Sequence, residues 1–140
     1  RSRIRFFVKR NLANTPTREV QTETGTMWVS TPEATAFDVV RYASGIGGLD
    51  HAATVLAELA DAIDPERLAA AAAGGVELAV VQRTGYLLGR FASRDVCGPL
   101  RDWLATRDAR MIPLSRSGPG AGDTDSVWKV RVNDVVEADL

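Results

Sequence analysis

Residues 22–40 read TETGTMWVSTPEATAFDVV, and within this stretch the pattern changes from extended strand to helix. Thr24-Gly25 is a turn signal between two short extended segments, so it predicts a β-hairpin. Thr31 can cap the N-terminus of a helix, Pro32 fits the first helical turn, and Glu33 lies favourably at the positive end of the helix dipole. The stretch therefore predicts a hairpin that leads directly into a helix.

The residues upstream of this stretch indicate more extended structure. Ile4, Phe6 and Val8 recur at every second position, which is typical of a strand with one buried face. Residues 11–17 hold Asn, Thr and Pro and predict a turn. We expect a small antiparallel sheet in the N-terminal third, with strands over residues 3–9, 18–23 and 26–30.

The residues downstream change to a helical period. Leu49, Ala52, Leu56, Leu59 and Ile63 are spaced three, four, three and four apart, which predicts an amphipathic helix. Similar spacing, together with cap, proline and glycine signals, predicts about five helices in all. They are expected over residues 31–43, 49–63, 64–73, 76–91 and 99–104.

The C-terminal part returns to strand patterns. Residues 111–114 and 127–132 are candidate strands, and the Gly- and Ser-rich loop over 115–126 is predicted to be flexible or disordered. The order of sheet, helices and sheet predicts an α+β fold. We expect one domain over residues 1–140, in which N-terminal and C-terminal strands form a small antiparallel sheet that packs with about five helices.

The composition excludes several classes of protein. A chain of 140 residues with 45% hydrophobic and 25% charged residues is typical of one globular domain. No apolar run approaches the ~18–20 residues of a membrane helix, and no signal peptide is present, so we expect a cytoplasmic protein with no membrane partner. The single cysteine, Cys97, and the single histidine, His51, exclude a disulfide framework and a His/Cys metal site.

The glycine-rich segments do not have the spacing of nucleotide-binding loops. Residues 118–122 lack the Gly-Lys-Ser/Thr ending of a phosphate-binding loop, and residues 45–48 lack the third glycine of a dinucleotide fingerprint. We therefore expect both segments to be turns. The sequence predicts no cofactor, no metal and no catalytic residue, and hence a protein that is not an enzyme.

One enzymatic alternative is left open by Glu33 and Asp38. They are five residues apart on one predicted helix, about 140° round its axis, so they would need further ligands to share a metal. Glu77 is a candidate for such a ligand. The alternative function is a nuclease-like enzyme that holds a divalent metal with these carboxylates.

Charge is distributed unevenly along the chain, although the formal net charge is only −1. Residues 1–20 have a net charge of +5, and residues 49–79 have a net charge of −5. Arg83, Arg90 and Arg94 follow at i, i+7 and i+11, which would place them on one helix face. Arginine binds phosphate with two parallel hydrogen bonds, so this face is a candidate nucleic-acid surface, and pairing with the acidic segment 49–66 is the alternative. The full set of candidate nucleic-acid contacts is Arg3, Arg5, Lys9, Arg10, Arg83, Arg90 and Arg94.

Three motifs resemble those of the AbiEi-type antitoxin C-terminal domain. Residues 29–38, VSTPEATAFD, are similar to a "v-s-t-P-E-x-T-x-x-D" signature that follows a short strand in that family. Residues 82–88, QRTGYLL, resemble its "R-x-G-Y-L-L" helix, and residues 128–133, WKVRVN, resemble its terminal "W-x-v-x-v-N" strand. The three motifs occur in the expected order across nearly the whole chain.

The resemblance implies an antitoxin and transcriptional regulator of a bacterial toxin–antitoxin or phage-defence operon. In such proteins an N-terminal winged helix-turn-helix binds the promoter, and the C-terminal domain neutralises a nucleotidyltransferase-like toxin. The chain opens on Arg1 and has its first methionine at Met27, so we expect it to be the C-terminal domain without its DNA-reading module. Its basic residues would then assist promoter binding in the full-length protein. A third reading is a plain protein-interaction domain that uses the exposed part of Trp28, Trp103 or Trp128.

Overall fold

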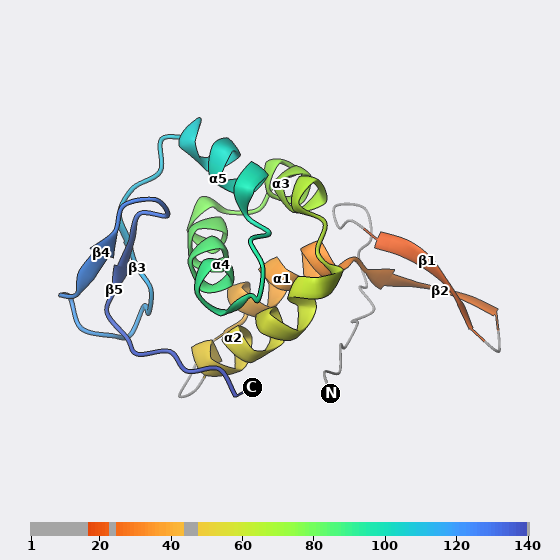
Figure 1. The fold of residues 1–140 in the computed structure, drawn as a ribbon, viewed down its shortest axis with the longest axis horizontal. Coiled ribbons are helices and arrows are strands. Elements are labelled where there is room, and N and C mark those ends of the chain that lie inside the picture. Colours follow the sequence, from red (N-terminus) through yellow and green to blue (C-terminus); the bar gives the residue numbers. More distant parts are fainter. Residues whose placement is uncertain (1–16, 23–24, 44–47, 140) are drawn as a thin grey trace.

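The computed structural model describes residues 17–22, 25–43 and 48–139, and the helices occupy the middle of the molecule (Figure 1). The predicted strand over residues 3–9 lies outside the described residues. The elements follow in the order β1 (Thr17–Thr22), β2 (Gly25–Ser30), α1 (Pro32–Arg41), α2 (Gly48–Leu59), the short 3-10 helix η1 (Ala60–Ala62), α3 (Pro65–Ala73), α4 (Leu78–Phe91), α5 (Gly98–Ala105), β3 (Ile112–Pro113), β4 (Asp123–Asp125) and β5 (Val130–Val132).

The strands form two separate sheets rather than one. β1 and β2 pair antiparallel, with Thr17 opposite Ser30 and Thr22 opposite Gly25, which confirms the predicted hairpin. The C-terminal strands form a three-stranded sheet in the order β3-β5-β4, in which β3 is parallel to β5 and β4 is antiparallel to β5. The α+β class is confirmed, but the expectation of one antiparallel sheet shared by both ends of the chain is wrong.

Chain geometry explains both parts of this correction. The hairpin and the C-terminal sheet lie on opposite sides of the helices, so their strands cannot pair (Figure 1). Between β3 and β5 the chain reverses direction twice, once into β4 and once out of it. β5 therefore runs in the same direction as β3, and the sheet is mixed.

The predicted helix starts are confirmed by their capping hydrogen bonds. Thr31 Oγ1 accepts a hydrogen bond from the backbone N–H of Ala34 at 3.2 Å. Asp64 Oδ1 accepts from the backbone N–H groups of Glu66 and Arg67 at 2.9 and 3.1 Å. These side chains satisfy N–H groups that have no partner within their own helix.

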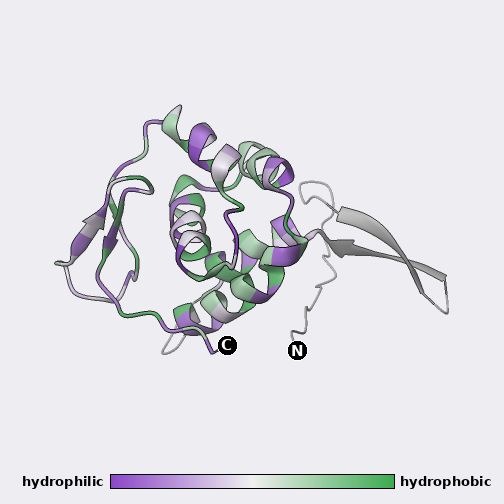
Figure 2. Cartoon of the chain, viewed as in Figure 1, coloured by the Kyte–Doolittle hydropathy of each residue, from purple (hydrophilic) through white to green (hydrophobic). Residues whose placement is uncertain are grey.

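The hydrophobic core lies between the helices, and α4 contacts α1, α2, α5 and β5. Each of these helices carries both hydrophobic and hydrophilic residues along its length (Figure 2). Phe37, Leu56, Leu87, Leu88 and Leu100 are among the fully buried side chains. Within the described residues, no helix is long and apolar enough to cross a membrane.

The loop between β3 and β5 contains regular structure that was not predicted. β4 forms at Asp123–Asp125, within the segment that was expected to be unstructured. Asn133 also ties the start of this loop to β5: its Oδ1 accepts from the N–H of Ser115 at 2.8 Å, and its Nδ2 donates to the carbonyls of Ser115 and Pro119 at 2.9 and 2.8 Å. The loop therefore has a fixed path beside the helices.

Candidate functional site

The first half of α4 packs against the part of the chain that follows α5. Gln82 is buried, and its Nε2 donates to the carbonyls of Arg110, Trp128 and Lys129 at 2.7, 3.1 and 3.2 Å. Three residues along, a Cβ atom added at Gly85 would lie 2.2 Å from Cζ3 of Trp128. Gly85 therefore allows the buried Trp128 ring to pack directly on the α4 backbone.

Arg83 lies between these two contacts and is also buried, with 8% of its surface exposed. Its Nε donates to the carbonyl of Pro113 at 3.0 Å. Burial lowers the pKa of Arg83, and the nearby positive charge of Arg116 lowers it further. No carboxylate in the described part of the chain forms an ion pair with Arg83.

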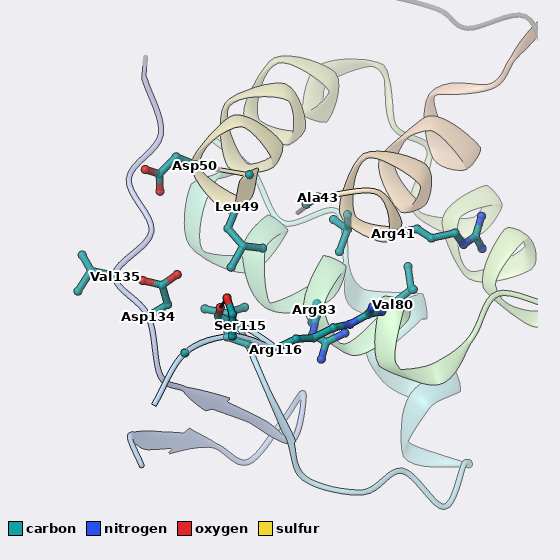
Figure 3. A pocket seen from close by; sticks show the side chains of 15 residues that line it. Arg41, Ala43, Leu49, Asp50, Val80, Arg83, Ser115, Arg116, Asp134 and Val135 are labelled. Atoms are coloured by element: carbon teal, nitrogen blue, oxygen red, sulfur yellow. Dashed lines mark hydrogen bonds between the residues drawn. The ribbon is translucent and has the colours of Figure 1, made fainter. Parts of the chain in front are cut away.

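Arg83 lines a pocket of about 630 Å³ that is formed by the end of α1, the start of α2, α4 and the turn that follows β3 (Figure 3). The walls are part apolar, from Val40, Leu49, Val80 and Leu114, and part polar. The turn contributes residues 115–118, which include Arg116, and Asn133 holds its first residue in place. The pocket is therefore lined by segments that are far apart in the sequence.

Two other charged residues that line this pocket, Arg41 and Asp50, have partners. Arg41 pairs with Asp38 at 2.7 Å and with Glu77 at 2.9 Å. The hydrogen bond from Arg41 holds the pKa of Glu77 below its ordinary value, and the charges of Arg41 and Arg116 act in the same direction. Across the pocket, Asp50 Oδ1 accepts a hydrogen bond from the backbone N–H of Glu137 at 2.9 Å.

The three arginines predicted to share one helix face have different surroundings. Arg83 is buried at the pocket, whereas Arg90 is exposed, lies over the ring of Phe91 and lines a second hollow together with three acidic residues. Arg94 lies beyond the end of α4, and its Nη2 donates to the carbonyls of Ala60 and Ile63 at 3.2 and 2.6 Å. Helical spacing does not relate Arg94 to the others because α4 ends at Phe91. The acidic residues of the second hollow are Asp123, Asp125 and Asp134.

Nucleic-acid binding by these arginines stays a prediction. Arg94 contacts the predicted acidic segment, but through backbone carbonyls rather than carboxylates. The other four candidate contacts, Arg3, Arg5, Lys9 and Arg10, lie outside the described residues. Arg116 also lines the pocket but was not among the predicted site residues. No local sequence signal shows that the turn after β3 folds back onto α4.

The carboxylates of the enzymatic alternative have different surroundings. Glu33 is buried, and its Oε2 accepts a hydrogen bond from the backbone N–H of Asp64 at 2.8 Å. Asp38 and Glu77 are instead joined by Arg41. Throughout the described ranges, no group of three or more His, Cys, Asp or Glu residues is arranged to hold a metal ion.

A family model of the AbiEi antitoxin C-terminal domain matches residues 1–90. The chain belongs to this family. Membership of the AbiEi family supports an antitoxin role in a toxin–antitoxin system, with a cognate toxin as partner. Comparisons with curated proteins and with solved structures gave no match.

The AbiEi match and the geometry together explain two of the sequence motifs. The matched range includes the hairpin and all of α4 except Phe91, whereas α5 and the C-terminal sheet lie beyond it. Gln82 and Gly85 lie at the end of the matched range and contact Trp128, which lies beyond it. The second and third motifs are therefore parts of one packing contact.

Proposed function

We propose that this AbiEi domain neutralises a nucleotidyltransferase-like toxin encoded in the same bacterial phage-defence operon. The family match over residues 1–90 carries this proposal. A domain that neutralises an enzyme needs a stable surface, and the buried core and the capped helices supply a rigid framework for one.

Co-expression with the toxin tests the proposal. Cells that express the toxin alone should stop growing, and cells that also express this chain should grow. Failure of the folded chain to restore growth or to co-purify with the toxin would contradict the proposal.

We propose further that the full-length protein binds its own promoter and that this domain adds phosphate contacts. The proposed contacts are the basic residues Arg3, Arg5, Lys9, Arg10, Arg83, Arg90 and Arg94. Arg90 is the best of these to test, because it is exposed and makes no ion pair within the described ranges. Arg83 and Arg94 donate hydrogen bonds to backbone carbonyls, so their substitution would also disturb the fold.

Salt-dependent binding of the full-length protein to promoter DNA tests this second role. Each phosphate contact that is lost should reduce the slope of log K against log salt by about 0.9. We expect Arg90→Glu to weaken promoter binding and to flatten this slope. An unchanged slope would contradict a DNA role for Arg90, and the same measurement on variants of the N-terminal basic residues tests them separately.

A further inference from the structure

The pocket beside α4 contains a buried positive charge that the described chain does not neutralise. Arg83 is 8% exposed and lines the pocket. Its Nε donates a hydrogen bond to the Pro113 carbonyl, so its two terminal amino groups are available to bind a ligand in the pocket. A buried charge without a partner is costly. An anion in the pocket would offset that cost.

A second guanidinium group faces the same space. Arg116 is exposed on the turn after β3 and makes no ion pair or hydrogen bond within the described part of the chain. Arg83 and Arg116 lie close enough for their positive charges to interact (Figure 3). Asn133 fixes the turn that presents Arg116, so the two like charges are brought together by the fold.

The acidic groups nearby limit the charge of the anion. Glu77 pairs with Arg41 and its charge also interacts with that of Arg116, whereas Asp50 and the exposed Asp134 lie on the other side of the pocket (Figure 3). Their negative charges would repel a chain of phosphates that extended across the pocket. One phosphate group, placed at the two arginines, avoids this repulsion.

The remaining wall indicates the rest of the ligand. The hydroxyl groups of Ser115 and Ser117 are 3.4 Å apart beside Arg116 and can donate to the additional oxygens that distinguish phosphate from carboxylate. The apolar side chains of Val40, Leu49 and Val80 also line the pocket, and a volume of about 630 Å³ suits a small organic molecule. We propose that this pocket binds a small molecule with a single phosphate group, which Arg83 and Arg116 hold while its organic part contacts the apolar wall.

Titration of the whole chain with inorganic phosphate and with adenosine monophosphate tests this assignment. Calorimetry measures affinity, and the backbone amide signals of residues 115–118 in NMR spectra report the place of binding. We expect both probes to shift these signals, with the monophosphate binding about tenfold more tightly than phosphate because of its apolar contacts. We expect adenosine triphosphate to bind more weakly than the monophosphate.

Matched variants distinguish specific binding in the pocket from general attraction of anions to positive charge. Arg116→Ala should weaken binding about tenfold without unfolding the chain, because this side chain is exposed. Arg83→Gln should abolish binding, with circular dichroism to confirm the fold. Arg107→Ala removes an exposed positive charge that does not line the pocket, so it should leave the affinity unchanged.

Three results would overturn the proposal. The first is the absence of any shift at ~10 mM phosphate, a concentration well above a millimolar dissociation constant. The second is equal weakening by Arg116→Ala and Arg107→Ala, which would show attraction by charge alone. The third is binding of adenosine triphosphate as tight as that of the monophosphate, which would show that the pocket does not select a single phosphate group.

Discussion

Gly85 is the residue at which the contact between α4 and the C-terminal segment is closest. The backbone of α4 touches the ring of Trp128 there. The other glycine of this helix, Gly89, lies about one turn further along and is more distant from the ring. A Cβ atom at Gly89 would lie 3.9 Å from Nε1 of Trp128, which is ordinary contact. The two glycines therefore make a matched pair for mutation.

We predict that Gly85→Ala destabilises the fold by about 1–3 kcal/mol, because the added methyl group forces the Trp128 ring to move. Gly89→Ala should be neutral or should stabilise by up to about 1 kcal/mol, because alanine is the better helix former. Denaturant unfolding followed by tryptophan fluorescence measures both changes. Equal stability of the two variants would show that the Trp128 contact does not constrain Gly85.

Cys97 is the second residue whose environment allows a specific prediction, because its thiol is buried. It is 1% exposed, and burial raises its pKa from an ordinary 9.0 to about 12, with the charge of Asp95 adding to the effect. The thiol of the unfolded chain ionises near pH 9.0, whereas the folded chain keeps the proton. Its contribution to stability is therefore complete below pH 9.0 and is lost as pH rises toward about 12.

We predict that Cys97 resists a thiol-specific reagent at pH 8 in the folded chain and reacts completely in denaturant, because only the thiolate is nucleophilic. The free energy of unfolding should fall more steeply above pH 9 in the original chain than in Cys97→Ala. Rapid labelling of the folded chain, or identical pH profiles, would contradict the buried, protonated thiol.

At the scale of elements, Asn133 determines the path of the loop after β3. Its amide group makes three hydrogen bonds to Ser115 and Pro119, and the turn between them carries Arg116 at the pocket. A single side chain on the segment after β5 therefore positions a turn that lies more than ten residues earlier in the sequence. The pocket depends on this contact.

We predict that Asn133→Ala increases hydrogen exchange of the amides at residues 115–118 and costs about 1–3 kcal/mol, because buried partners lose their hydrogen bonds. Asn133→Asp is the matched control. It keeps an acceptor for the Ser115 N–H but cannot donate to the two carbonyls, so it should loosen the carbonyl side of the turn only. Exchange at 115–118 that is the same in all three proteins would refute this role.

At the scale of the whole molecule, the family match and the core do not end at the same place. The match ends at residue 90, but eight of the buried hydrophobic residues lie beyond it, and four of these come after α5. The four after α5 are Leu114, Trp128, Val130 and Val136. The AbiEi domain of this chain is therefore completed by residues beyond the family match.

We predict that a chain truncated after residue 109 loses its cooperative thermal transition. Removal of these four side chains would expose α4 and the buried Gln82, whose hydrogen-bond acceptors lie at Arg110, Trp128 and Lys129. Differential scanning calorimetry of the full and truncated chains measures the change. A truncated chain with the same melting temperature would show that the core is complete without the C-terminal sheet.

The helices and the hairpin could be predicted from the sequence because their signals are local. Thr31 and Asp64 cap helices through N–H groups two or three residues away, and the paired strands β1 and β2 follow one another closely in the sequence. Such interactions join residues that are close in the sequence, so the pattern of neighbouring residues predicts them. The α+β class followed from the order of these elements.

Only the tertiary structure decided which elements meet. The parallel pairing of β3 with β5, the burial of Arg83 and its approach to Arg116 all join segments that lie well apart in the sequence. Arg83 and Arg90 have equivalent positions in the helical repeat, yet one is buried at a pocket and the other is exposed. The reason is that burial and strand pairing depend on which surfaces the folded chain brings together, whereas caps and periodicity depend only on near neighbours.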